Sequence, residues 1–301
     1  MSALTVIIPT HRGGALLYRC LQSVLRHAPS GTEILVVDDA SPQEALQSII
    51  RDFPTILLFR LPRRRGFCYA ANIGIEAAHN PIVELLNDDT EVAAGWAEAA
   101  LAHFQQSDVV AVAPLILQYP KRKGDSTIPY AYIDAAGDDY DPGGYAWKRG
   151  HGLPWSDQLP LHLRVAGSVT SASACAAFYR REAIRAAGGL ALSFKAYFED
   201  VDLGLRLRQR GGEIIFEPAS IVWHHGSASY GRSPYRPLLE QQSCNEERLF
   251  WRHWRYYGGW RLLPRHLAVL LGKFCRRWSE GRLLPWTFGR LRAWGELVVK
   301  P

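Results

Sequence analysis

Residues 82–89 read Ile-Val-Glu-Leu-Leu-Asn-Asp-Asp, a short apolar run that ends in one amide and two acids. Apolar runs of this length, bounded by turn-forming residues, are typical of buried β-strands. Similar runs occur on both sides of it along the chain. The predicted strands are Leu4–Pro9, Glu33–Val37, Ile56–Phe59, Ile82–Leu86 and Val109–Ala113.

Segments of helical period separate these strands. Apolar residues recur at three- and four-residue spacing between the first two strands, and further helices are predicted at Gln43–Asp52, Phe67–Ala78 and Ala94–Phe104. A strict alternation of strand and helix produces a mostly parallel sheet with helices on both faces. The sequence therefore predicts an α/β fold.

The second half of the chain is less regular. Residues 118–165 show little periodicity and are predicted as a long irregular insertion or a few edge strands. An acid-led helix follows at residues 198–211, and a predominantly helical tail closes the chain. We therefore expect a domain of residues 1–235, with halves 1–115 and 116–235, and a helical extension of residues 236–301.

Composition excludes several classes of protein. The chain has 301 residues, 48% of them hydrophobic and 21% charged, which is ordinary globular composition. Its longest apolar runs fall far short of the roughly 20 residues that a spanning helix needs, and no leader pattern precedes Leu4. The five cysteines are scattered without C-x-x-C, which argues against a disulfide framework and a cysteine zinc site. We expect a cytoplasmic protein.

The tail differs from the body in charge and in aromatic content. Residues 245–301 hold 12 Lys or Arg against 4 Asp or Glu, and six of the ten tryptophans. Cationic, Trp-rich helices are typical of contact with an anionic membrane surface. The alternative is that the tryptophans dock helices onto the body and the arginines are solvated. The sequence leaves both open.

Polar residues follow each predicted strand. In parallel sheets ligands bind beyond the carboxyl ends of the strands, so Pro9–Arg12, Asp38–Asp39 and Asn87–Asp89 are candidate ligand contacts. No G-x-G-x-x-G follows the first strand and no P-loop motif occurs in the chain. The sequence therefore lacks the main motifs that would identify a dinucleotide oxidoreductase or a P-loop NTPase.

Two clusters could bind a divalent ion. Asp88 and Asp89 would repel each other unless a cation lies between them, and Mg²⁺ or Mn²⁺ takes such oxygens together with phosphate oxygens and water. An Asx turn or a helix cap explains the same residues. His224 and His225 end a later strand, where an imidazole is either a ligand or a hydrogen-bonded structural residue.

The remaining acids also have two explanations each. Asp38 and Asp39 could accept hydrogen bonds from a base or ribose, or could make a turn. Glu199 and Asp200 lie in a first helical turn, where the negative charge of an acid interacts favourably with the helix dipole. Aromatic neighbours at 197–198 could instead desolvate one of them and make it a base.

Six motifs occur in order along the chain: V-I-I-P-T-H-R from Val6, V-V-D-D-A-S from Val36, R-G-F-C-Y-A-A-N-I-G from Arg65, L-L-N-D-D-T from Leu85, Y-F-E-D-V-D-L-G-L-R-L-R-Q-R-G from Tyr197 and V-W-H-H-G-S-A-S from Val222. Over about residues 4–230 this set resembles the family 2 glycosyltransferases of GT-A fold, particularly their rhamnosyltransferase-like branch. Each motif is weak alone, and the ordered set is specific.

The resemblance implies transfer of a sugar from a nucleotide-diphosphate donor to a hydroxyl of a glycan or lipid-linked acceptor, with inversion and assistance by Mg²⁺ or Mn²⁺. It assigns Asp89 and His224 to the metal, with His225 left open by the doublet, and Asp200 as general base beside Glu199. The donor contacts that it implies are Pro9, Thr10, Arg12, Asp38, Asp39, Gly66, Asn72, Asn87 and Asp88.

The sequence departs from the family pattern at Asn87, which begins the D-x-D-like motif, and at Ala191, where many relatives carry Asp. A nucleotidyltransferase is a poor match, because His11–Gly14 is not the glycine-rich basic loop that such enzymes need. The rival from another class is a non-catalytic protein that uses the basic tail to bind a membrane or nucleic acid. No nucleic-acid-binding motif supports the latter, so we expect no nucleic-acid partner.

Overall fold

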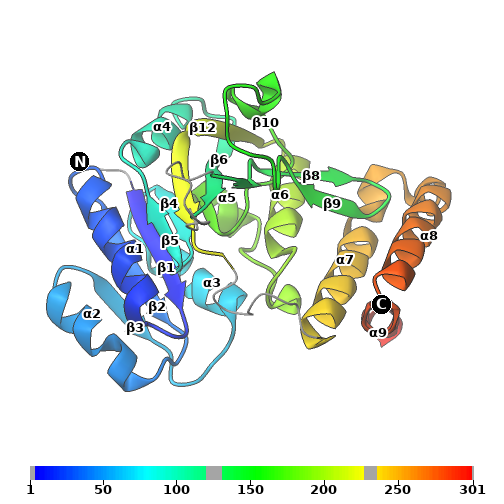
Figure 1. Cartoon of the computed structure of the whole chain (residues 1–301), viewed down its shortest axis with the longest axis horizontal. Helices are drawn as coiled ribbons and strands as arrows, with labels where there is room; N and C mark the ends of the chain where they lie inside the picture. The colour runs from blue at the N-terminus through cyan, green and yellow to red at the C-terminus, as the bar shows by residue number, and fades with distance from the viewer. Residues whose placement is uncertain (1–3, 120–130, 227–235, 300–301) are drawn as a thin grey trace, which may run out of the picture. The chain divides into compact units, whose positions relative to one another are not determined.

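The computed structural model describes residues 4–119, 131–226 and 236–299 (Figure 1). By contacts the chain forms two compact units. The first comprises residues up to Asp138 together with Lys148–Gly226, and the second comprises Asp139–Trp147 together with the residues after Gly226. A short internal segment thus joins the C-terminal helices, which the sequence-based division at residue 235 did not anticipate.

The first unit is built on a ten-stranded sheet whose N-terminal half is parallel. Its order in space, β3-β2-β1-β4, places the first strand in the middle, because the chain adds β2 and β3 on one side of β1 and then returns to add β4 on the other. The bounds are β1 Leu4–Thr10, β2 Glu33–Asp38, β3 Leu57–Arg60 and β4 Ile82–Leu86.

The other half of the sheet is mixed. β11 lies antiparallel between β4 and β6, and β12 runs parallel to β6. The short strands β5, β7 and β10 pair at its edges. The bounds are β5 Thr90–Val92, β6 Val109–Gln118, β7 Ile133–Ala135, β10 Gly167–Ser168, β11 Ala176–Arg180 and β12 Glu213–His224. The α/β fold class is confirmed, with less parallel pairing in this half than predicted.

Helices cover both faces of this sheet (Figure 1). Alternate residues of β1 point to opposite sides: Ile7 joins the core under α3, α5 and α6, whereas Val6 and Ile8 join the core under α1, α2 and α4. The bounds are α1 Gly14–His27, α2 Gln47–Asp52, α3 Phe67–Ala77, α4 Trp96–His103, α5 Arg181–Ala186 and α6 Glu199–Gln209, with 3-10 turns at Gln43–Leu46, Leu161–Leu163 and Leu192–Phe194.

The second unit holds three long helices and most of a two-stranded sheet. Prolines in the first turns of α8 and α9 divide the helices, because proline lacks the N–H that an interior helical position donates. The bounds are β8 Asp138–Asp141, β9 Tyr145–Lys148, α7 Arg236–Tyr257, the 3-10 turn Gly259–Leu262, α8 Leu263–Ser279 and α9 Leu283–Val299. Within the described residues, no helix is both long and apolar enough to cross a bilayer.

Candidate active site

Three loops meet at the carboxyl edge of the parallel strands. β1 lies between β2 and β4, with Thr10 opposite Asp38 in register. The Thr10 hydroxyl donates a hydrogen bond to Asp88 Oδ2 at 2.5 Å, and the Asp39 N–H donates to the Thr10 carbonyl at 2.7 Å. The structure therefore brings four predicted donor contacts to one edge. Pro9 lies beside them, inside β1.

The two acids after β2 hold the neighbouring loops. Asp38 accepts from the Ser41 N–H at 2.9 Å and lies 3.4 Å from the Arg60 guanidinium. Asp39 accepts from the N–H groups of Arg65 and Gly66, at 2.6 and 2.8 Å. These are the turn contacts that the sequence left as an alternative, and they fix the loop that begins α3.

Gly66 stands at the N-terminus of α3 with φ +91°, a conformation that glycine adopts without strain. Arg12 is exposed in the loop after β1, where its charge favours ionised Asp88. Asn72 lies inside α3, and its side chain exchanges two hydrogen bonds of 2.8 Å with the backbone of Leu190. Asn72 thus anchors the turn at residues 188–190.

The loop after β4 is a turn that presents two acids. The Asn87 carbonyl accepts from the Thr90 hydroxyl at 2.7 Å, and the Asn87 N–H donates to Cys175 at 2.9 Å. Burial raises the pKa of Asp88 to about 6, although the Thr10 hydrogen bond opposes this shift.

Asp89 faces His224. β5 pairs with β12 so that Thr90 lies opposite His224, which carries the imidazole to the preceding acid. His224 Nε2 lies 3.3 Å from Asp89 Oδ1. Burial would raise the pKa of Asp89, but the His224 hydrogen bond and charge outweigh it and leave the pKa below its usual range.

The second histidine of the doublet has other partners. His225 Nε2 lies 2.8 Å from Glu91 Oε1, and its ring stacks on Tyr119 with centroids 4.0 Å apart. Its backbone N–H donates to the Asp89 carbonyl at 2.9 Å. Of the two side chains, His224 is the one against Asp89.

A third acid orients His224 from behind. His224 Nδ1 lies 3.1 Å from Asp134 Oδ2, and Lys148 Nζ reaches the same oxygen at 3.1 Å. Burial lowers the pKa of His224, but its interactions with Cys175 and with its two carboxylate partners outweigh this and hold the pKa well above the usual value. Sequence reasoning missed Asp134 and Lys148, because both lie in the stretch without periodicity and match no motif.

This donor set fits a divalent cation. A carboxylate and an imidazole nitrogen face each other 3.3 Å apart, and a cationic imidazolium is already stabilised between two acids. A metal would replace that proton. Within the described ranges, no group of three or more His, Cys, Asp or Glu could hold a metal ion. If a divalent ion binds here, Asp89 and His224 would be its two protein ligands, and water and a diphosphate would take the remaining positions.

The acids of α6 form a second cluster, in which Glu199 is buried and Asp200 is half-buried. Asp200 accepts from the N–H groups of Ala174 and Val201, at 3.1 and 2.9 Å. Buried Glu199 has one oxygen without a hydrogen-bond partner among the residues that the structure describes. Burial raises the pKa of both carboxyls, and repulsion by Asp200 raises that of Glu199 further.

The backbone before α6 presents these acids in a strained conformation. Tyr197 and Phe198 have φ of +72° and +68°, in the left-handed region that L-residues rarely adopt. Such strain persists where surrounding structure enforces it, and it is frequent at functional sites. Asp202, in contrast, forms an ion pair of 2.8 Å with Arg206 and is structural.

The two clusters are electrostatically connected. Buried Asp138 donates its backbone N–H to Ser171, and the charge of Asp200 adds to burial in raising the pKa of Asp138. Lys148 favours the ionised forms of Asp134, Asp138 and Asp200 together. One lysine thus lies within electrostatic reach of the candidate metal centre and of the α6 acids.

A parallel half-sheet with acids at its carboxyl edge, continued by a mixed half with an acid-led helix, is the GT-A arrangement. The chain belongs to glycosyl transferase family 2, whose family model matches residues 5–188. The sequence-based assignment to this family is confirmed.

Curated relatives show similarity over the same region. The pre-mycofactocin glycosyltransferase of Mycobacterium tuberculosis (strain CDC 1551 / Oshkosh) is 29% identical over 222 residues, covering 73% of this chain and 42% of that protein. The human probable polypeptide N-acetylgalactosaminyltransferase 8 is 29% identical over 235 residues, covering 73% and 35%. The chain thus spans less than half the length of these relatives.

Solved structures share the fold. GalNAc-T7 with UDP, GalNAc and Mn²⁺ superposes with a TM-score of 0.61 at 21% identity, covering 81% of this chain and 47% of that one. The mannosyltransferase PcManGT from Pyrobaculum calidifontis, in complex with GDP-Man and Mn²⁺, superposes with a TM-score of 0.59 at 15% identity, covering 97% and 86%. At these identities the likeness shows the GT-A fold.

Proposed function

We propose that this protein is a glycosyltransferase that moves a sugar from a nucleotide-diphosphate donor to an acceptor hydroxyl, with inversion at the anomeric carbon. This proposal rests on the Asp89–His224 pair at the carboxyl edge of the sheet, in a chain of this family. The acceptor class that we propose is a glycan or lipid-linked saccharide of the cell envelope.

In this proposal Asp200 is the general base. A base raised in pKa yet still ionisable takes a proton from a hydroxyl more readily than an ordinary carboxylate does. The acceptor oxygen then forms its bond to the anomeric carbon while the bond to the diphosphate breaks. The proton ends on Asp200, and the nucleoside diphosphate leaves with the bonding electron pair. The charge of Asp200 raises the pKa of Glu199. A neutral Glu199 beside Asp200 leaves the negative charge on Asp200, where the proposal needs it.

Asp89 and His224 would hold the divalent ion, and Asp134 would orient His224. Bound Mg²⁺ or Mn²⁺ supplies charge neutralisation for the departing diphosphate. Two structural neighbours were solved with Mn²⁺, which supports a divalent ion here. Their nucleotides differ in base, so the donor base requires a direct test, and the rhamnosyltransferase-like branch stays a prediction.

The non-catalytic alternative is not favoured. Burying Asp88, Glu199 and Asp138 raises the pKa of each carboxyl, and that costs folding free energy. A protein that only bound a membrane or nucleic acid would gain nothing from acids held in this way. A catalyst gains a tuned base and a metal site.

For location we propose a cytoplasmic protein that contacts an anionic membrane surface through residues 245–301. Their positive charge supports this, and such a contact would suit a lipid-linked acceptor.

A thermal-shift panel tests the proposed activity. UDP, dTDP, GDP and CDP are each added with and without Mn²⁺ or Mg²⁺ to wild type, His224→Ala and His225→Ala. We expect a metal-dependent rise of several degrees for one nucleotide, lost in His224→Ala and kept in His225→Ala. If none of the nucleotides shifts the wild type with either metal, the donor-site proposal is wrong.

A further inference from the structure

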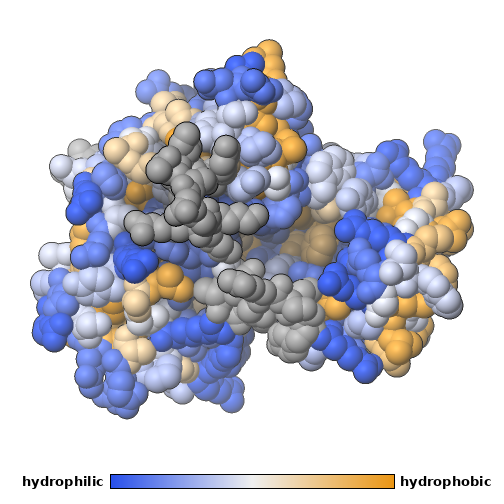
Figure 2. Space-filling view, in the orientation of Figure 1, coloured by the Kyte–Doolittle hydropathy of each residue, from blue (hydrophilic) through white to orange (hydrophobic). Residues whose placement is uncertain are grey.

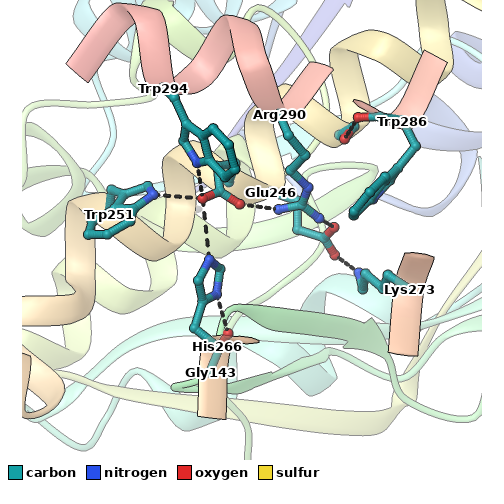
Figure 3. A network of polar contacts seen from close by, with 10 residues as sticks. Gly143, Glu246, Trp251, His266, Lys273, Trp286, Arg290 and Trp294 are labelled. Atoms are coloured by element: carbon teal, nitrogen blue, oxygen red, sulfur yellow. Dashed lines mark hydrogen bonds and ion pairs between the residues drawn. The ribbon is translucent and has the colours of Figure 1, made fainter. Parts of the chain in front are cut away.

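Helix α8 turns its polar side inward. His266 and Lys273, two helical turns apart, both reach buried acids of α7 (Figure 3). His266 Nε2 lies 3.2 Å from Glu247 Oε1, and Lys273 pairs with Glu246. Arg290 of α9 contacts both acids. Charged groups that usually face water therefore lie between the helices of this unit.

The opposite side of α8 is apolar and exposed. Leu267, Leu271, Phe274 and Trp278 recur at four- and three-residue spacing, so they form one stripe along the helix. Their exposed fractions are 62%, 65%, 41% and 68%. A helix in water normally has the reverse arrangement, with its leucines inward. Exposing this stripe to water costs free energy, and a partner surface that covered it would remove that cost.

α9 continues the apolar surface. It packs beside α8, with the Phe274 and Trp286 rings 6.4 Å apart. Leu284, Phe288 and Leu291 again follow helical spacing, and each is at least half exposed. Hydrophobic surface gathers over these helices at the right of Figure 2. We call Leu267, Leu271, Phe274, Trp278, Leu284, Phe288 and Leu291 the outer stripe.

Positive charge borders the outer stripe. Residues 261–296 contain eight Lys or Arg and two Glu, and six of these basic residues remain once Lys273 and Arg290, which pair with the α7 acids, are set aside. On α8, Arg277 lies three residues after Phe274, and on α9 the exposed Arg292 lies four residues after Phe288, so both arginines are next to the outer stripe. Basic residues beside an exposed apolar helix face are the pattern of helices that lie in the interface of an anionic bilayer. A second protein copy would bring the same positive charge and be repelled.

The tail tryptophans mostly serve packing. Trp251 and Trp294 each donate a hydrogen bond of 2.6 Å to Glu247 (Figure 3), and Trp254 is buried. Trp260 and Trp278 remain largely exposed. The count of tryptophans is therefore a poor argument for membrane contact, and the outer stripe is a better one.

We propose that the outer stripe binds an anionic phospholipid surface, with α8 and α9 lying in the plane of the interface. This inference rests on the membrane contact proposed for residues 245–301 and names the surface that makes it. Arginines attract the surface, and the leucine and aromatic side chains enter the boundary between headgroups and acyl chains.

Vesicle flotation of the full chain tests this. Vesicles of phosphatidylcholine with one quarter phosphatidylglycerol are compared with phosphatidylcholine alone, at low and high salt. We expect wild type to float with the anionic vesicles at low salt. Leu271→Asp should lower the vesicle partition coefficient about tenfold or more, because it places a charge in the apolar boundary. The matched control is Ile50→Asp, at an exposed apolar position on α2.

A site-specific probe adds an independent readout. Cys275 is exposed on α8, one turn after Leu271, and the other four cysteines are buried. A polarity-sensitive fluorophore on Cys275 should shift to the blue on addition of anionic vesicles. It should not shift with phosphatidylcholine alone.

The outcomes separate the two proposals. Absence of wild-type binding to anionic vesicles overturns both the membrane contact and its assignment to the outer stripe. Equal binding by wild type and Leu271→Asp, without a fluorescence shift, overturns the stripe and leaves the tail contact standing. Light scattering could instead show a wild-type dimer that Leu271→Asp dissociates. If wild type also fails to bind vesicles, the stripe is a contact between copies and the proposal is overturned. The glycosyltransferase proposal is tested separately by the nucleotide panel.

Discussion

At Asp134, one carboxylate oxygen lies 3.1 Å from both the His224 imidazole and the Lys148 ammonium. A carboxylate behind a ligating histidine fixes the orientation of the ring and increases its basicity. Lys148 in turn restricts Asp134. The predicted metal site therefore depends on two residues that need not touch the ion.

Asp134→Asn tests this dependence. The amide keeps the size of the side chain but loses its charge, so we expect the Mn²⁺ midpoint of the nucleotide-dependent thermal shift to rise about 10- to 100-fold. Asp157→Asn, at an exposed acid of the same unit, should leave the midpoint unchanged. An unaltered midpoint in Asp134→Asn would mean that Asp134 does not position a metal ligand.

Asp200→Asn tests the general base. We expect turnover, measured as release of nucleoside diphosphate, to fall about 10²- to 10⁴-fold while the nucleotide-dependent thermal shift is kept. Burial raises the pKa of Asp200, so the wild-type rate should fall as the pH decreases through that raised pKa. The variant should lack this acidic limb. Glu182→Gln, at an exposed acid, is the control, and full turnover by Asp200→Asn would exclude the assigned role.

At the scale of elements, β4 carries a buried acid. Glu84 is fully buried and accepts hydrogen bonds from Trp96 Nε1 of α4 at 3.1 and 3.2 Å. Burial raises the pKa of Glu84 to about 8, against the smaller effect of this hydrogen bond. Because the folded pKa exceeds the unfolded one, the contribution of Glu84 to folding stability is greatest below about pH 4.3 and falls until the pH passes about 8.

Glu84→Gln should remove that loss and keep an acceptor for Trp96. We expect the free energy of unfolding of wild type, measured in urea, to decrease by about 4 kcal/mol more than that of the variant between pH 4.5 and 9. Glu98→Gln, at an exposed position of α4, should follow wild type. Parallel pH profiles for wild type and Glu84→Gln would show that Glu84 ionises normally.

The contact of α7 with α9 depends on a glycine. A Cβ at Gly289 would lie 2.4 Å from the Glu240 carbonyl and 2.6 Å from Ser243 Cβ, whereas one at Gly295 meets nothing within 4 Å. Gly289→Ala should therefore lower the free energy of unfolding by about 1–3 kcal/mol through overpacking. Gly295→Ala should be neutral or slightly stabilising, since alanine favours helix. If both variants melt at the same temperature, α7 and α9 move apart to accommodate the added methyl group without a loss of stability.

Local patterns predicted these elements where the determinants were local. The bounds of β4 matched the prediction, because a short apolar run with turn residues at its end is a local signal. The antiparallel insertion of β11 and the length of β12 depend on pairing with distant strands. Asp134 becomes recognisable only when β12 brings His224 beside it, so the sequence could not reveal its role.

At the scale of the molecule, the chain forms two units that interrupt each other in sequence. His266 holds the second one together. Its ring stacks on Phe250 with centroids 3.6 Å apart, and its Nδ1–H donates a hydrogen bond of 2.7 Å to the Gly143 carbonyl. With Nε2 near Glu247, one side chain joins α7, α8 and the segment between β8 and β9.

His266→Ala should therefore destabilise the second unit and spare donor binding in the first. Losing the stacking and two buried hydrogen bonds should cost about 2–4 kcal/mol. We expect calorimetry to show that the transition of the second unit moves to lower temperature. The thermal shift that nucleotide and Mn²⁺ induce should keep its wild-type size. Tyr256→Ala, which removes an exposed ring of α7, should melt like wild type. If His266→Ala abolishes the nucleotide-induced shift, the donor site depends on the second unit and the two units do not act separately.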